Sequence, residues 1–182
     1  MAEKKKRGCI ARIFLLLTAA VVVLVIIVSI ASSGESEQAE PITARRGEMV
    51  QTKRFEISIQ KLEMRDEVGN DFFNSSPAEG GVYVALKYKY KNISDEPIGS
   101  FSTPSAELVG PNSTGYSRDS GASSSFAVET EIDQKILSDL NPGIAVTTVD
   151  VFEISKEQIS SGQWHIEISS TPKVVVPLPV KS

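Results

Sequence analysis

One long uncharged segment constrains this chain more than any other feature of its sequence. Within residues 13–30 every side chain is apolar except those of Thr18 and Ser29. As a helix, the segment reaches roughly 27 Å at ~1.5 Å per residue, close to the ~30 Å hydrocarbon core of a bilayer. Its β-branched residues are poor helix formers in water, but backbone groups in lipid must pair internally, which favours a helix. The sequence therefore predicts a transmembrane helix over residues 13–31.

Basic residues cluster ahead of this segment. Residues 1–12 carry one acid, Glu3, and several bases, namely Lys4, Lys5, Lys6, Arg7 and Arg12. Cytoplasmic flanks of membrane helices carry an excess of Lys and Arg, so residues 1–12 are expected to be a cytoplasmic tip. We therefore predict a single-pass protein of the cell membrane, with its N-terminus in the cytoplasm and its body outside.

A cleaved signal peptide is the competing interpretation of the same segment. The tripeptide Ser29-Ile30-Ala31 has the small residues that a signal peptidase requires. The apolar segment is longer than the ~7–15 residues typical of a signal peptide, which favours an uncleaved anchor. Cys9 precedes the apolar segment and so cannot be a lipoprotein acceptor. Because it is the single cysteine, no disulfide can form in the exported part.

Composition excludes several classes of site in the body. The net charge is −4, and the residues after the basic tip are acidic overall, so no run of bases follows the pattern of a nucleic-acid backbone. The single histidine, His165, cannot complete the three or four nitrogen and sulfur ligands of a zinc site. No Gly-x-Ser-x-Gly motif accompanies that histidine. We predict no metal, no cofactor and no nucleic-acid partner.

The chain beyond the apolar segment divides into a tether and one domain. Residues 32–48 are small and polar and show no apolar periodicity, which is typical of a flexible linker. Residues 49–182 contain strand-like segments, a short helical segment at 155–162 and a long, polar, exposed loop at 110–125. The expected strands cover residues 55–60, 82–91, 101–109, 131–137, 144–154, 164–169 and 174–180. Short strands separated by turn residues predict an all-β fold, an antiparallel immunoglobulin-like β-sandwich.

The clearest strand pattern covers residues 82–91. Apolar or aromatic residues alternate with a second set, and we expect the first set inside, namely Val82, Val84, Leu86, Tyr88 and Tyr90. The opposite face would carry a possible binding face made of Tyr83, Lys87, Lys89 and Lys91. Such lysines either meet an anionic polymer or lipid headgroups, or only keep the sheet face solvated. At the end of the chain, Pro177 and Pro179 cannot donate to a ladder, which predicts an edge strand.

Two groups of acidic residues are candidates for metal binding or for glycoside hydrolysis. Residues 66–71 place three acids in a turn, but their spacing does not match a calcium-binding EF-hand. On the expected strand at 131–137, Glu131 and Asp133 would share a face with Glu129, as paired carboxylates of a glycosidase do. A charged, solvated face is the simpler interpretation. We therefore predict no catalytic residues.

The order of these elements resembles a known family. The similarity covers residues 55–59, 82–94, 140–143 and 149–154, and with their spacing it extends over about residues 50–170. The family consists of bacterial exported domains of unknown function whose immunoglobulin-like fold resembles the mycobacterial immunoprotective antigen. The resemblance implies an N-terminal anchor or lipoprotein signal, a polar linker and one β-sandwich, with no catalytic motif to transfer. This chain departs from the family in lacking a lipobox cysteine and in its Ser/Gly-rich middle loop.

These observations predict a non-enzymatic, membrane-anchored extracytoplasmic binding or interaction module. Its expected partners are the membrane, through the N-terminal helix, and an extracytoplasmic protein or anionic polymer. The first alternative is a secreted, soluble form of the same domain, released by signal peptidase. The remote alternative is a hydrolase that uses the acidic residues.

Overall fold

The computed structural model describes residues 39–133 and 139–178, which belong to one folded unit. The predicted cytoplasmic tip and transmembrane segment, residues 1–31, lie outside these ranges. Within the described residues, no helix combines the length and the apolar character that crossing a membrane requires. The N-terminal anchor thus stays a prediction.

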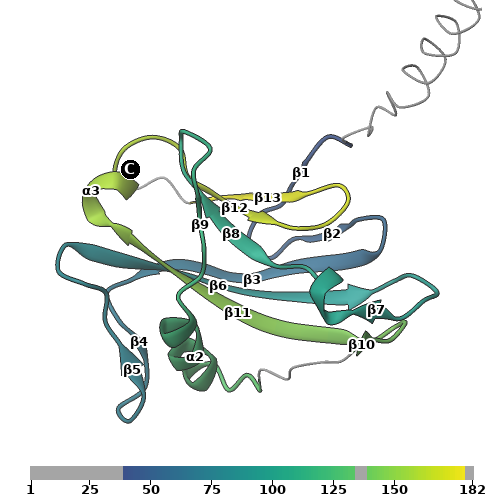
Figure 1. The fold of residues 1–182 in the computed structure, drawn as a ribbon, viewed down its shortest axis with the longest axis horizontal. Coiled ribbons are helices and arrows are strands. Elements are labelled where there is room, and N and C mark those ends of the chain that lie inside the picture. The colour runs from purple at the N-terminus through teal and green to yellow at the C-terminus, as the bar shows by residue number, and fades with distance from the viewer. Residues whose placement is uncertain (1–38, 134–138, 179–182) are drawn as a thin grey trace, which may run out of the picture. The chain divides into compact units, whose positions relative to one another are not determined.

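Two β-sheets face each other across a shared apolar core (Figure 1). The first, in the order β11-β6-β3-β2, is antiparallel and joins β2 (Met49–Gln51), β3 (Phe55–Arg65), β6 (Gly81–Asn92) and β11 (Ala145–Ser155). The second, in the order β1-β13-β12-β8-β9, joins β1 (Ile42–Thr43), β8 (Ala106–Val109), β9 (Gly115–Tyr116), β12 (His165–Ile168) and β13 (Val174–Pro177). All of its pairs are antiparallel except β1 with β13. The predicted all-β antiparallel sandwich is confirmed at this level.

Shorter elements attach to the two sheets. A hairpin of β4 (Val68–Gly69) and β5 (Asn74–Ser75) follows β3, and a small ladder joins β7 (Ile98–Gly99) to β10 (Asp139–Leu140). The helical segments are a 3₁₀ turn η1 (Ser100–Ser102), α2 (Ser120–Glu129) and α3 (Lys156–Ile159). Figure 1 shows α2 on the side of the first sheet that faces away from the second.

Strand β6 is central in the first sheet, between β3 and β11. Its five predicted inward residues are all buried, from Val84 and Leu86 at 0% exposure to Val82 and Tyr90 at 7%. They pack in one core with residues of the facing sheet, such as Ile166 of β12. A shift of one residue would exchange this set for the lysines, so burial of the apolar face specifies the strand register. The sequence-based prediction for this strand is confirmed.

A turn predicted from Asn141-Pro142-Gly143 connects β10 to β11. Gly143 has φ +76°, a backbone conformation that residues other than glycine rarely adopt. The fully buried side chain of Asn92 supports this end of the sandwich, since its amide donates to the carbonyls of Leu140 and Glu96 at 2.8 Å. The same side chain accepts from the Ser94 backbone N–H at 2.9 Å. This end is therefore closed by hydrogen bonds that only a residue with both donors and acceptors can make.

Helix α2 corrects two sequence-based predictions. Residues 120–125, expected in an exposed loop, form its first turns, and residues 131–133, expected in a strand, follow its end. Asp119 caps the helix by accepting from the Ala122 N–H at 2.8 Å. The helix lies against β11, an edge strand whose Val151 N–H donates to Ser123 Oγ at 2.9 Å. The small residues that resemble a loop in the sequence instead let a helix approach and cover a strand edge.

The edge of the second sheet also differs from expectation. Strand β13, predicted at an edge because of Pro177, lies between β12 and β1. The additional strand comes from within the predicted linker, where Ile42 pairs with Val174 and Ala44 is fully buried. Folded structure thus starts ahead of residue 49. A two-residue strand carries no sequence periodicity, so only its partner reveals it.

Candidate functional site

The outer face of the first sheet is divided into a covered and an open half. In the covered half, Tyr83 and Ala85 of β6 lie with Val149 and Val151 of β11 beneath α2. Phe126 of α2 is fully buried there. Helix α2 is held in place because Glu129 accepts from the Arg65 guanidinium at 3.0 Å and from the Gly69 N–H at 2.8 Å.

Tyr83 was predicted to join the lysines on an exposed face, and this prediction is wrong. Its side chain points to the expected side of the sheet, but it is only 3% exposed because α2 and the β4–β5 hairpin pack over that half. Burial, together with the negative charges of Asp119 and Glu153, raises the pKa of the Tyr83 phenol. Tyr83 therefore belongs to a second small core.

The open half carries the remaining predicted binding residues, Lys87, Lys89 and Lys91, which we call the lysine face. Lys89 is exposed, and the other two are half-buried. On β3 their register partners are Lys61, Ser58 and Glu56, and on β11 they are Val149, Thr147 and Ala145. The structure therefore brings the three lysines together on one surface that α2 and the β4–β5 hairpin do not cover.

Of the six register partners of the three lysines, one is acidic, namely Glu56 opposite Lys91. Among the described residues, no salt bridge involves Lys87, Lys89 or Lys91. Lys61 lies at the border with the covered half. Its ammonium pairs with Glu63 at 2.9 Å and lies 5.6 Å from the centre of the Phe126 ring. Like charges at directly opposed positions such as Lys61 and Lys87 destabilise a sheet, and the Lys61–Glu63 pair offsets this repulsion in part.

A different arrangement, around Asp150, was missed by the sequence analysis. Asp150 lies on β11 but faces the interior of the sandwich, where it is 4% exposed. Its Oδ2 accepts from the Tyr88 hydroxyl at 3.1 Å and its Oδ1 from the Arg118 guanidinium at 3.2 Å. These residues line a cavity of about 590 Å³ at the edge of the sandwich, together with Glu107 of β8 and others. The sequence feature that could have revealed this arrangement is an acidic residue at an inward-facing position of a strand.

The contacts of Asp150 indicate a structural role, because its carboxylate is hydrogen-bonded to Tyr88 and Arg118. Burial raises its pKa, while the Arg118 charge and the hydrogen bonds from Tyr88 and Arg118 offset part of that rise. Burial beside this carboxylate also holds the pKa of Tyr88 well above its usual value. Both carboxylate oxygens are already hydrogen-bonded, so Asp150 links β6 and β11 to the chain at Arg118. Because the net shift of its pKa is upward, these contacts only partly offset the cost of burying the Asp150 charge.

The acidic residues weighed as hydrolase candidates do not share a face. Glu129 ends α2 and is bonded to Arg65, whereas Glu131 follows the helix with φ +55°. The acidic turn at 66–71 belongs to the β4–β5 hairpin, whose Val68 is buried under α2. Within the described ranges, no group of three or more His, Cys, Asp or Glu residues is placed to hold a metal ion.

His165 lies on β12, as predicted from its alternation with Trp164 and Ile166. Its Nε2 is 3.4 Å from Glu167 Oε1, and the other oxygen of that carboxylate pairs with Lys173 at 2.7 Å. Hydrogen bonding from Lys173 contributes most to the lowered pKa of Glu167. This cluster is a surface charge pair on the second sheet, and no serine nucleophile contacts it in the described structure.

Comparison with known proteins places the chain in a family. No family model matches it. The Uncharacterized protein YxkC of Bacillus subtilis (strain 168) is 44% identical over 125 residues, which are 68% of this chain and 69% of that protein. A conserved hypothetical protein from Bacillus anthracis, whose crystal structure is known, is 29% identical, with a TM-score of 0.62 over 67% of this chain and 87% of that one.

A third comparison concerns the fold alone. An uncharacterized β-sandwich protein from Clostridium difficile 630 has a TM-score of 0.55 at 14% identity, over 81% of this chain and all of that one. These three proteins do not bear on the predicted resemblance to the mycobacterial antigen, which stays a prediction. The identity to YxkC, over more than two thirds of both chains, shows that this chain belongs to the YxkC family, and its described part is a β-sandwich.

Proposed function

We propose that this protein is a non-enzymatic extracytoplasmic binding module whose lysine face binds an anionic polymer. One observation carries the proposal. In a chain with a net charge of −4, Lys87, Lys89 and Lys91 lie in a row on an uncovered sheet face, and no salt bridge among the described residues involves them. Unpaired cations of this kind raise the local concentration of an anionic ligand.

The geometry of the row suits a linear anion. The lysines are two residues apart on a strand, so their Cα atoms are spaced by roughly 6.6–6.8 Å. Strand β6 is paired on both sides, which orders the backbone before any ligand binds and lowers the entropic cost of binding. Helix α2 protrudes from the same side of the sheet (Figure 1), where it would hold a flat bilayer away from the row. A flexible polymer chain can lie beside the helix.

The membrane location is part of the proposal. The apolar segment at 13–31 would anchor the chain, with residues 1–12 inside and an immunoglobulin-like β-sandwich outside. The alternative is a secreted domain released after Ala31. The mass of the mature N-terminus separates the two, because a peptide that includes Arg12 on the membrane-bound protein excludes cleavage after Ala31.

Binding can be measured with the full chain in detergent and long-chain inorganic polyphosphate as the probe. We expect the triple substitution Lys87→Gln, Lys89→Gln and Lys91→Gln to weaken binding by about tenfold or more at low salt. It should also reduce the slope of log affinity against log salt by about 2 to 3, since each lysine that releases a counterion contributes nearly one. The control substitutes two exposed lysines outside the lysine face, Lys156 and Lys173, which pair with Asp66 and Glu167, and should change affinity by less than about twofold.

Two outcomes would contradict the proposal. If the triple variant and the control weaken polyphosphate binding equally, net charge rather than the lysine face is responsible. The second comparison uses vesicles of phosphatidylglycerol. If only vesicle binding depends on the three lysines, the ligand is a lipid headgroup and the polymer is excluded.

A further inference from the structure

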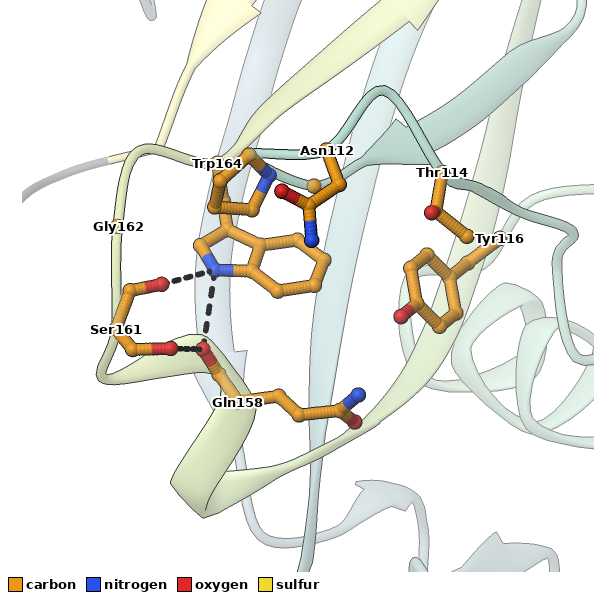
Figure 2. A pocket seen from close by; sticks show the side chains of 9 residues that line it. Asn112, Thr114, Tyr116, Gln158, Ser161, Gly162 and Trp164 are labelled. Atoms are coloured by element: carbon orange, nitrogen blue, oxygen red, sulfur yellow. Dashed lines mark hydrogen bonds between the residues drawn. The ribbon is translucent and has the colours of Figure 1, made fainter.

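A separate cavity of about 330 Å³ lies on the other sheet, between the β8–β9 turn and the segment from α3 to β12 (Figure 2). None of the residues that line it is charged. Its polar side chains are amides and hydroxyls, and its aromatic side chains are those of Tyr116 and Trp164. Lysines, arginines and carboxylates are therefore absent from the walls of this site. The volume is near the lower end of the ~300–1,000 Å³ range of small-molecule sites.

Two aromatic rings form the apolar surface of the cavity. The rings of Tyr116 and Trp164 are 5.5 Å apart between centroids and tilted by 50°. Trp164 is mostly buried and Tyr116 is half-buried, so the phenol offers the more accessible ring. Because the rings already contact each other, no flat slot is left between them for a nucleobase. A ligand would lie across the pair.

The structure holds the indole in position before any ligand binds. Its Nε1 donates to the backbone carbonyls of Ser161 at 2.9 Å and Gln158 at 3.2 Å, as the dashed lines in Figure 2 show. A Cβ atom at Gly110 would lie 2.9 Å from the indole ring, so a larger residue there would displace it. A site held in this way loses little entropy when a ligand binds.

Four polar side chains at the cavity have no hydrogen-bond partner among residues 39–133 and 139–178. They belong to Asn112, Thr114, Tyr116 and Gln158, whose side chains all line the cavity. Figure 2 shows the amides of Asn112 and Gln158 approaching the ring pair from opposite sides. Each amide offers donors and an acceptor, and each hydroxyl offers both. These groups are therefore available to a ligand that also carries donors and acceptors.

We propose that this cavity binds a neutral saccharide. A sugar ring has an apolar C–H face, which an aromatic ring can cover, and hydroxyls that both donate and accept. Uncharged walls provide no counter-charge for a phosphate or a carboxylate, and so favour a neutral ligand. The site shares no lining residue with the lysine face, so this inference does not depend on the polymer proposal.

The experiment uses the intrinsic fluorescence of Trp164, which is the only tryptophan of the sequence. The full chain, in a detergent without sugar headgroups, is titrated with chito- and malto-oligosaccharides, and with glucose 6-phosphate as the charged control. We expect a saturable change in emission with at least one neutral sugar and none with the phosphate. Tyr116→Ala and Gln158→Ala should each weaken binding by about tenfold, the effect of losing one good contact. Lys89→Gln should leave sugar affinity unchanged.

Saturation-transfer NMR on the same samples tests the contact from the ligand side. The C–H face of the bound sugar should receive saturation from the protein, and Tyr116→Ala should reduce that transfer at equal sugar concentration. Near-UV circular dichroism checks that each variant is folded. The proposal is overturned if no neutral sugar gives a saturable response at millimolar concentrations, or if both variants fold and bind as tightly as the original chain.

Discussion

The two halves of the outer face of the first sheet differ although one strand runs through both. On β6, Tyr83 and Ala85 are buried beneath α2, while Lys87 and Lys89, two and four residues further along, remain uncovered. The period-two pattern directs all four side chains to the same side. Whether that side meets solvent depends on another element, which packs over half of the strand. The alternation of residues in a strand therefore predicts the side of the sheet to which each side chain points, and not whether that side chain is buried.

Substitution of Phe126 in the covered half should produce the largest loss in the free energy of unfolding. Phe126→Ala removes the fully buried ring that joins α2 to the sheet, and we expect a loss of about 3 to 5 kcal/mol in the free energy of unfolding. Urea unfolding measures this loss, and hydrogen exchange should show the amides of α2 opening first. Val128→Ala is the matched control, since Val128 is on the same helix but 46% exposed and should change stability by less than about 0.5 kcal/mol. Equal losses for the two variants would show that α2 does not depend on its buried face.

Asp150 is a charged residue on the inner face of the same sheet. A buried charge requires a partner, whereas the lysines of the open half do not. Asp150 has a raised pKa, so the folded chain binds a proton more readily than the unfolded chain does. The stability contributed by this group therefore falls as the pH rises from the ordinary Asp range through the raised pKa. Arg118→Gln removes a lowering influence on that pKa and should raise it further.

We expect Arg118→Gln to cost about 1 to 2 kcal/mol at pH 7.5, a moderate value because the Arg118 side chain is half-exposed. The loss should shrink as the pH falls through the pKa of Asp150, since a protonated carboxyl needs no cation. Urea unfolding over a series of pH values measures it, with Lys156→Gln, from an exposed ion pair, as the control. A loss that stays constant with pH would show that Arg118 acts through packing alone.

The open half should give the smallest effect on stability. Lys89→Ala is expected to change the free energy of unfolding by less than about 0.5 kcal/mol, because the side chain is exposed and unpaired in the described structure. On the inner face of the same strand, Leu86→Ala should cost about 2 to 5 kcal/mol by opening a cavity in the core. Urea melts of the two variants compare the faces directly. Similar losses would mean that the faces of β6 are assigned wrongly.

Several elements were predictable because local chemistry specifies them. The alternation in β6, the turn at Asn141-Pro142-Gly143 and the strand that follows it all appear in the structure as expected. Strand β3 was recognised only to residue 60, although it continues to Arg65. A bulge between Ile59 and Lys61 inserts one residue and breaks the alternation, so the pattern changes phase there.

Amino-acid sequence alone determined which side chains of β6 face inward, because a strand has a period of two and buried lysines are costly. It also determined the direction of the three lysines. Long-range packing determines that Tyr83 is covered, that Asp150 contacts Arg118 and Tyr88, and that Tyr116 contacts Trp164. These contacts join residues far apart along the chain. Helix α2 shows the reason most clearly, since its Ser- and Ala-rich sequence has a weak apolar pattern of its own and its position depends on the edge of β11 that it covers.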